Sequence, residues 1–333
     1  MYLLLGICLA LAAFLTVNAI ASLAASFAWR VLDPFIRRWS ARARAEILFA
    51  LRIASPALAL VFVGLFFVPA YIGYEPRATS EVVSAKLAAF ALLSAAGVTF
   101  AIHRACCSYL ATRALRRQWL AVATEIQLPG IDIPASRIPH SFPIIAVIGT
   151  VQPRLFIANQ VLQSLNAEEL AAAIAHECGH LAARDNLKRG LLRGCRDALM
   201  IAPCGRSIDR AWAETAEAAA DEHAAQASAT VALNLASALV TIARMIPVGM
   251  HAELPLAAFL VGGETRGVKA RVRRLLELAS LNPATRTRRF AFGRILPLLS
   301  LALLTTVGTA LATNSHVLLA VHSAVERVVS LLS

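Results

Sequence analysis

The sequence predicts a mainly α-helical membrane protein, with about four transmembrane helices and one inserted α+β domain that contains a small β-hairpin or sheet. Of its 333 residues, 58% are hydrophobic and only 16% are charged. A soluble domain is usually about 45–50% apolar and about 25% charged. Long charge-free runs also alternate with arginine-rich stretches, as expected for helices that cross a bilayer.

The charge-free runs predict the membrane spans. A transmembrane helix needs about 20 apolar residues, and the runs Met1 to Trp29 and Ile53 to Tyr74 meet this length without a charged side chain. We predict three spans at about 2–29, 50–74 and 83–103, a fourth at about 295–311, and a short amphipathic C-terminal tail from about 317 to 333.

The arginines predict the orientation of these spans. The formal net charge is +12, and arginine-rich stretches follow the first span, from Arg30 to Arg44, and the third, from Arg104 to Arg117. Positive ends face the cytoplasm, so the N-terminus is predicted outside. Nucleic-acid binding is excluded, because no basic stretch carries the interleaved aromatic residues that base stacking needs.

The middle of the chain has a different composition. Charges are spread through residues 113–292 and turn residues cluster, with four prolines in "QLPGIDIPASRIPHSFP". We predict a cytoplasmic domain at 113–292, between a membrane part at 1–112 and a last part at 293–333. Two β-rich runs from Ile144 to Ile157 predict a hairpin. The charge-free stretch 224–243 is more polar than the spans and predicts a buried helix of the domain, with a fifth span as the alternative.

The stretch "AIAHECGHLAARDN" carries the chemistry. His176 and His180 are four residues apart, so on a helix both imidazoles lie on one face and can bind one ion. Glu177 follows the first histidine, where a general base of a zinc hydrolase is expected. The alternative is a helix with two histidines that are satisfied by ordinary hydrogen bonds.

A second stretch, "RAWAETAEAAADEHAAQ", supplies a third ligand. Glu217 and Asp221 are four residues apart and share a helical face. We predict Glu217 as the third ligand, which leaves one position for a water molecule, and Asp221 as the acceptor of a hydrogen bond from a ligand histidine. Glu214 and His223 are lower-ranked competitors for the ligand role. Without a metal, Glu217 and Asp221 would instead belong to a solvated acidic face that also includes Glu214 and Glu222.

At these motifs the chain resembles the integral-membrane zinc metallopeptidases of the BlaR/MecR type (metallopeptidase family 56) and, more distantly, the HtpX and CAAX prenyl protease type. The similar segments are "VIGTVQPRLFIANQVLQSLNAEELAAAIAHECGHLAARDNL" and "RAWAETAEAAADEHA". The resemblance implies a gluzincin-type zinc peptidase domain with one Zn²⁺ per chain. It assigns His176, His180 and Glu217 as ligands, Glu177 as the catalytic glutamate, and Asp221 and Asp185 as supporting acids.

The chain departs from these relatives in three places, of which the mildest is Ala220, where the relatives have a cysteine before the supporting acid. About twenty residues follow the predicted fourth span, so we expect no built-in sensor domain of the receptor type. The downstream histidine of the HtpX and prenyl protease relatives is Thr265 here, whereas Arg271 matches their arginine. Arg271 is therefore a candidate oxyanion or substrate-binding residue, and Arg154 of the predicted hairpin is a second candidate. The alternative for Arg271 is a basic face near anionic lipid.

The predicted function is zinc-dependent endopeptidase activity on protein substrates at the cytoplasmic membrane face, in a regulatory or signalling role. The expected partners are a protein or peptide substrate docked on the hairpin edge, the lipid bilayer, and a sensor or repressor protein. The resemblance and the Ala/Arg-rich composition place the chain in a bacterial inner membrane. Two alternatives stay open: an HtpX-like quality-control protease, and a non-catalytic zinc-binding signalling or scaffold protein.

Overall fold

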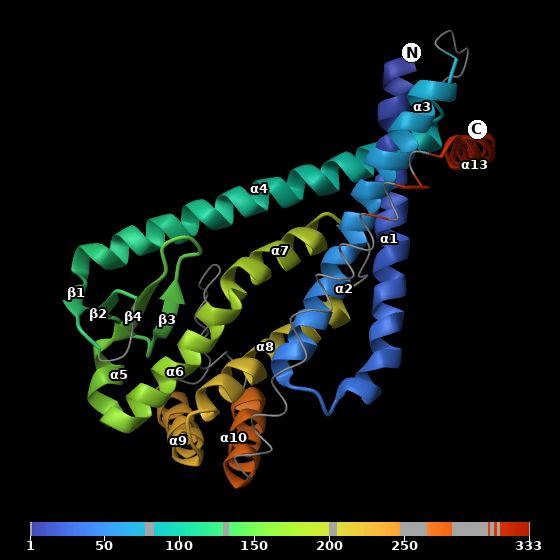
Figure 1. The fold of residues 1–333 in the computed structure, drawn as a ribbon. Helices are drawn as coiled ribbons and strands as arrows, with labels where there is room; N and C mark the ends of the chain where they lie inside the picture. The colour runs from blue at the N-terminus through green and yellow to red at the C-terminus, as the bar shows by residue number, and fades with distance from the viewer. Residues whose placement is uncertain are drawn as a thin grey trace.

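The computed structural model describes residues 2–76, 83–128, 133–199, 205–246, 265–281 and 314–332, together with Thr306, Ala310 and Leu311. Within these residues the fold is mainly helical, with one small mixed sheet of four strands (Figure 1). Three described helical stretches are long and apolar enough to cross a membrane, at Tyr2–Ile36, Ala41–Tyr74 and Ala85–Val122. The predicted fourth span lies almost wholly outside the described residues.

The first two apolar stretches form an antiparallel pair. Helix α1 (Tyr2–Ile36) runs one way, and α2 (Ala41–Val61) returns and continues through a π-helical segment (Phe62–Phe67) into α3 (Val68–Tyr74) (Figure 1). Both α1 and α2 extend beyond the predicted spans, so little of the predicted basic loop remains.

Ion pairs and a helix cap connect the two ends of the short loop between α1 and α2. Asp33 in the last turns of α1 binds Arg37 at 3.1 Å and Arg44 at 3.0 Å, and the side chain of Ser40 caps α2 by accepting a hydrogen bond from Ala43 N. An N-cap serine supplies an acceptor that the first helical turn lacks. The arginines that predict a loop are therefore carried mostly on helix ends.

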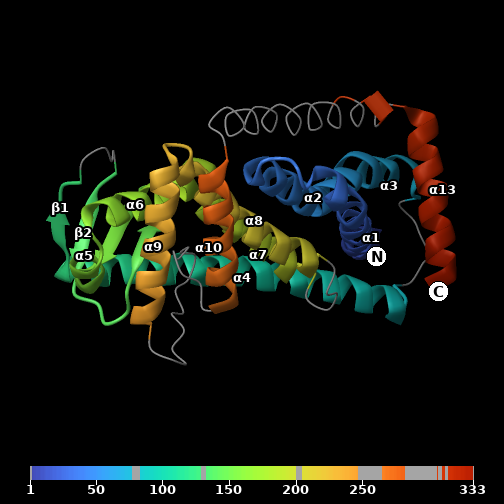
Figure 2. The ribbon, with the colours of Figure 1, turned by 90° about the horizontal axis from the view of Figure 1, so that it is seen from below.

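The third apolar stretch is one continuous helix, α4 (Ala85–Val122). It leaves the α1–α2 pair at a steep angle and reaches the sheet at its far end (Figures 1 and 2). There the Trp119 ring packs edge-on against Phe156, with ring centroids 5.2 Å apart. The predicted domain start at 113 therefore falls inside a helix that links the membrane part directly to the sheet.

The sheet has the order β1-β2-β4-β3, from strands β1 (Thr124–Ile126), β2 (Ala135–Ile138), β3 (Ile145–Ile148) and β4 (Arg154–Ala158). The antiparallel pair β3–β4 confirms the predicted hairpin. Strand β2 was not predicted, because it lies inside the proline-rich stretch, and it pairs parallel to β4. Pro134 and Pro139 flank β2 and stay outside it, where a missing N–H removes no ladder bond.

Six further helices complete the part of the chain that the structure describes up to Ser280. They are α5 (Asn159–Ser164), α6 (Ala167–Ala183), α7 (Asp185–Asp197), α8 (Arg206–Ala225), α9 (Ala229–Met245) and α10 (Thr265–Ser280). The charge-free stretch at 224–243 mostly forms α9, whose Leu235, Leu239 and Ile242 are buried in the same core as the sheet and α6. Near the C-terminus, α13 (Ser315–Leu332) lies beside α3.

A second core joins α8 to the apolar pair α1–α2. It contains Trp29 from α1, Leu48 from α2, Leu192 from α7 and Trp212 from α8. On α8, the Glu222 side chain is only 6% exposed, and its Oε2 accepts a hydrogen bond from Ala41 N at 2.8 Å. Glu222 is therefore not part of a solvated face, as the metal-free alternative expected, but is packed against the start of α2.

Two glycines test the contact between α4 and α7. A Cβ on Gly97 in α4 would lie 2.6 Å from the Ala198 carbonyl oxygen, whereas one on Gly194 in α7 would meet nothing within 4 Å. We expect Gly97→Ala to lower the free energy of unfolding by about 1–3 kcal/mol through overpacking. Gly194→Ala should raise it by about 0.5–1 kcal/mol. Thermal unfolding in detergent measures both, and an undiminished stability of Gly97→Ala would contradict the close approach.

Candidate metal centre

Helix α6 presents both motif histidines on one buried face. Its start is fixed by Asn166, whose Oδ1 accepts a hydrogen bond from Glu169 N at 2.8 Å, while Asn166 N donates to Glu169 Oε2 at 3.1 Å. This reciprocal capping box satisfies two backbone donors at the helix start. One turn apart along the helix, the rings of His176 and His180 lie with centroids 4.8 Å apart, and both residues are buried.

The end of α6 brings a supporting acid back to the second histidine. Arg184 adopts a left-handed conformation with φ of 55°, which ends α6 and lets α7 start at the next residue in a new direction. Such a conformation is unfavourable for a residue other than glycine. After this turn, Asp185 Oδ2 lies 2.7 Å from His180 Nδ1. The Nδ1 atom is therefore held by Asp185, and Nε2 faces away from it.

The third predicted ligand comes from α8, which crosses α6 at small residues. A Cβ on Gly179 would lie only 3.0 Å from Ala220 Cα, so a side chain there would push the helices apart. This close approach places Glu217 Oε2 3.7 Å from His176 Nε2, and Glu217 Oε1 3.5 Å from His180 Nε2. One ligand atom from each residue lies within 4.8 Å of the other two.

A layer of charged residues surrounds the first histidine. Asp221 Oδ1 lies 2.9 Å from His176 Nδ1, so each histidine has a carboxylate at Nδ1. Arg271 from α10 binds Asp221 Oδ1 at 2.6 Å and Glu217 Oε2 at 3.1 Å, and its side chain is only 13% exposed. The structure thus places Arg271 at the cluster, between the two carboxylates, and not on a lipid-facing surface.

Glu177 points toward the edge of the sheet. Its Oε2 accepts a hydrogen bond from Val147 N of β3 at 3.4 Å, and Asn186 Nδ2 donates to the Val147 carbonyl at 2.9 Å. Sequence reasoning missed both contacts. The only signal for Asn186 was its place directly after the motif, and nothing in the sequence points to the backbone of Val147.

Burial and charge separate the protonation states of the two histidines. Burial, aided by the nearby Arg271 cation, lowers the pKa of His176 to about 4. Burial by itself also lowers the pKa of His180, but the carboxylates of Glu217 and Asp185 outweigh it and raise the pKa to about 10. Burial raises the pKa of Glu177 to about 7. In the metal-free chain at neutral pH, His176 is therefore neutral, whereas His180 is positively charged, with a proton on each ring nitrogen.

The cluster has the donors and the unmet polar atoms of a metal site. His180 Nε2 and Glu177 Oε1 are buried and have no hydrogen-bond partner within the described part of the chain. Buried polar atoms are almost always satisfied, so these two mark a place where a further group is expected. Two imidazoles and one carboxylate form a set that zinc takes in catalytic sites, with a position left for water. The residues therefore fit a zinc ion.

The remaining sequence candidates lie elsewhere. Glu214 is exposed on α8, and neither it nor His223 belongs to the cluster. Arg154 Nη1 binds Ser136 at 2.9 Å and Glu125 at 3.3 Å. These partners lie on β2 and β1, on the opposite side of β4 from β3. The structure does not bring Arg154 to the cluster, and a part in substrate binding stays a prediction.

A comparison with known protein families agrees with this geometry. Residues 110–249 match the family model of peptidase family M48, and this range includes α6, α8 and the whole sheet. The match supports a membrane-type zinc metallopeptidase. It does not confirm the features particular to the BlaR/MecR or the HtpX type. No curated protein matches the chain.

Proposed function

We propose that this protein is a membrane-embedded zinc endopeptidase that cleaves protein substrates in a regulatory role. One observation carries the proposal: the side chains of His176, His180 and Glu217 converge within 4.8 Å, beside the buried carboxylate of Glu177. Two carboxylates, Asp185 and Asp221, hold the histidines at Nδ1. Such supporting acids fix the tautomer of a ligand histidine and leave Nε2 to face the ion.

We place the cluster on the cytoplasmic side of a bacterial inner membrane. The arginine-rich ends of α1 and α2, around 37–44, lie close to α8 through the Glu222 contact with Ala41. The basic half of α4, from Arg104 to Arg117, reaches the sheet at Trp119. Both basic regions therefore lie on the side of the cluster, and positive ends of spans face the cytoplasm.

The chemistry divides between the ion and the chain. Zinc, when bound by His176, His180 and Glu217, supplies a Lewis acid that polarises the scissile carbonyl and makes a water molecule more acidic. Glu177 accepts a proton from that water on Oε1, the oxygen without a partner, and then donates it to the leaving amine. Its raised pKa, about 7, suits a group that both takes and returns a proton near neutral pH.

The edge of β3 is the proposed docking site for an extended substrate. Because Ala158 N donates to the Ile144 carbonyl of the same pair, the alternation of an antiparallel ladder turns the Val147 backbone groups to the outer edge. Glu177 and Asn186 occupy those groups in the substrate-free chain. A substrate strand added at this edge would take over these hydrogen bonds and lie directly beside Glu177.

Zinc content and proteolysis test the proposal together. The full chain, purified in detergent, should contain one zinc and cleave an unfolded protein substrate. A chelator should remove both the zinc and the activity, and added zinc should restore both. One bound zinc without cleavage under any condition would contradict the catalytic proposal and favour a structural metal. A few discrete products would fit a regulatory enzyme, and many products would contradict that part of the proposal.

Zinc binding should release a proton. His180 holds a proton below its pKa of about 10, and a ligand histidine must be neutral. The apparent zinc affinity should therefore rise with pH, by about tenfold per unit between pH 7 and 9 for one displaced proton. Calorimetry in buffers of different ionisation enthalpy counts this proton. In Asp185→Asn, which loses one carboxylate that raises the pKa, the dependence should be weaker, and an equal slope would contradict the assigned cause.

The supporting role of Asp221 predicts a smaller effect than loss of a ligand. Asp221→Asn removes the charge that holds His176 Nδ1 and Arg271, but keeps the size of the side chain. We expect zinc affinity to fall by about 10–100-fold, measured by competition with a chromogenic chelator. Glu214→Gln, an exposed change on the same helix, is the matched control and should not alter the affinity. An unchanged affinity in Asp221→Asn would rule out the supporting role.

A further inference from the structure

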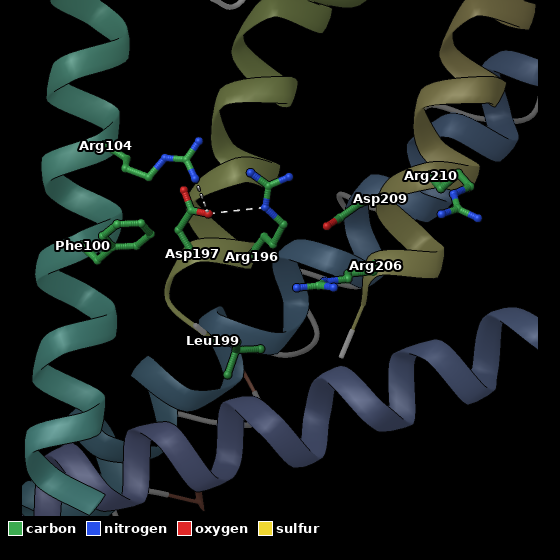
Figure 3. Close-up of a pocket in the computed structure, with 8 residues that line it drawn as sticks. All are labelled: Phe100, Arg104, Arg196, Asp197, Leu199, Arg206, Asp209 and Arg210. Carbon is green, nitrogen blue, oxygen red and sulfur yellow. Dashed lines mark hydrogen bonds and ion pairs between the residues drawn. The ribbon is translucent and has the colours of Figure 1, made fainter. Parts of the chain in front are cut away.

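A cavity of about 540 Å³ lies between α4, the end of α7 and the start of α8 (Figure 3), and it shares no residue with the metal cluster. Its lining includes four arginines but only two acidic residues. Arg104 comes from α4 and Arg196 from α7, while Arg206 and Arg210 lie in the first turns of α8. None of these residues takes part in the proposed peptidase chemistry.

Both acids of the cavity are already engaged. Asp197 Oδ1 lies 3.5 Å from Arg104 Nη1 and 3.3 Å from Arg196 Nε, the two contacts drawn in Figure 3. Asp209 Oδ1 accepts a hydrogen bond from the buried Arg52 at 3.0 Å. Within the described residues, the other two arginines of the cavity, on α8, have no acidic partner. The cavity therefore has an excess of positive charge that the chain itself does not neutralise.

A neighbouring arginine reflects the same excess. Burial lowers the pKa of Arg193, and the cations of Arg189, Arg196 and Arg104 lower it further. Crowding of like charges of this kind is costly unless an anion is near. The start of α8 adds to the positive charge of the cavity. Gly205 precedes the helix without a side-chain cap, and the first turn of a helix carries a partial positive charge.

The cavity lies at the end of the apolar part of two candidate spans. Arg104 follows the charge-free run 87–102 of α4, and Arg52 precedes the run 53–74 of α2. Arg52 also donates a hydrogen bond to Ser22 of α1 at 3.1 Å, so the polar contacts beside the cavity connect it to α1 and α2 as well as to α4. The end of an apolar run is where we expect the apolar belt of a bilayer to give way to its headgroups.

Apolar surface adjoins the positive charge. Phe100 lines the cavity from α4 with an exposed fraction of 40%, and Leu92, about two turns earlier on α4, is 70% exposed. Leu199 also lines the cavity but is only 2% exposed, so Phe100 supplies most of its apolar surface. A small soluble anion gains no binding free energy from such apolar surface, whereas acyl chains pack on it.

We propose that this cavity binds the phosphate headgroup of an anionic phospholipid, with its acyl chains along the exposed apolar side of α4. The arginines on α8 supply the charge that holds the phosphate, since guanidinium groups bind phosphate oxygens in pairs. Basic pockets at the membrane surface recognise anionic lipid in this way. The proposal does not depend on zinc binding or on peptidase activity.

Lipid retention measures this site directly. The full chain would be reconstituted in nanodiscs containing equal parts of phosphatidylglycerol and phosphatidylcholine, extracted with mild detergent, and analysed by native mass spectrometry. We expect the wild type to retain phosphatidylglycerol in preference to phosphatidylcholine by about tenfold or more. The double variant Arg206→Gln/Arg210→Gln should lose this preference. Arg206→Lys/Arg210→Lys, which keeps the charge, should retain at least part of it.

The matched control removes the same charge from elsewhere on the basic surface. Arg113→Gln/Arg117→Gln changes two exposed arginines of α4 and should leave the lipid preference intact. Equal loss in the control would overturn the site in favour of a general surface attraction. Equal retention of both lipids by the wild type would also overturn it, without any need for a variant to fold. Displacement of the lipid by millimolar glycerol phosphate would instead identify a site for small soluble phosphates.

Discussion

Replacing Glu177 by glutamine is expected to abolish peptide hydrolysis while zinc remains bound. Glutamine has nearly the shape of glutamate, and its carbonyl oxygen can still accept the hydrogen bond from Val147 N that Glu177 Oε2 accepts at 3.4 Å. It cannot take a proton from water, and loss of a general base lowers the rate by on the order of 10²–10⁴-fold. The ligands are untouched, so zinc content should not change.

The measurement compares turnover and zinc content in the same preparation. Wild type, Glu177→Gln and the exposed control Glu214→Gln would each be assayed against an unfolded fluorescent substrate, with zinc per chain determined by mass spectrometry of the metal. Because burial raises the pKa of Glu177 to about 7, the neutral replacement should also leave the thermal stability near that of the wild type. Cleavage by Glu177→Gln at the wild-type rate would remove Glu177 from the role of base.

Local sequence rules were enough for the part of the site that lies on one helix. The spacing of His176 and His180 puts them on one face of any helix, and the cap at Asn166 that starts this helix is also local. Glu217 and Asp221 could be predicted because they share the face of a second helix. What could not be predicted is how closely the two helices pack, because this depends on the contact of Gly179 with Ala220.

Three structural features could not be predicted from the sequence. The left-handed Arg184, which turns Asp185 toward His180, has no sequence signal, because left-handed residues are usually glycine or asparagine. Strand β2 pairs with β4 across about twenty residues, and its flanking prolines indicate turns. The length of α4 could not be predicted either, because charged residues indicate where a helix leaves the bilayer but not where the helix itself ends.

The paired acids of α8 show why composition alone misleads about charged residues. Glu217 and Asp221 face inward, where Arg271 and the histidines compensate them. Burial alone would raise the pKa of both carboxyl groups, yet the neighbouring cations hold both below their ordinary values. Buried carboxylates are tolerated only with such partners. A sequence reading cannot distinguish this arrangement from a solvated acidic face unless the downstream arginine is already placed.

Removal of the Glu217 carboxylate is expected to eliminate stoichiometric zinc. Glu217→Ala leaves two histidines and an arginine at the cluster, and Arg271 then retains Asp221 as its carboxylate partner at 2.6 Å. The fold should therefore persist, whereas zinc affinity should fall by more than the about 10–100-fold that is typical of a supporting residue. Peptidase activity should be lost with the metal.

A thermal shift separates loss of the metal from loss of the fold. A ligand that binds only the native state stabilises it by about 2.7 kcal/mol when its concentration is one hundred times its dissociation constant, so adding EDTA should lower the Tm of the wild type. The Tm of Glu217→Ala should not respond to EDTA, because no bound zinc remains to remove. Glu214→Ala, three residues earlier on α8, should respond like the wild type. If Glu214→Ala lost zinc and Glu217→Ala kept it, the ligand assignment would pass to the exposed glutamate, and α8 would have to be rotated from its present position.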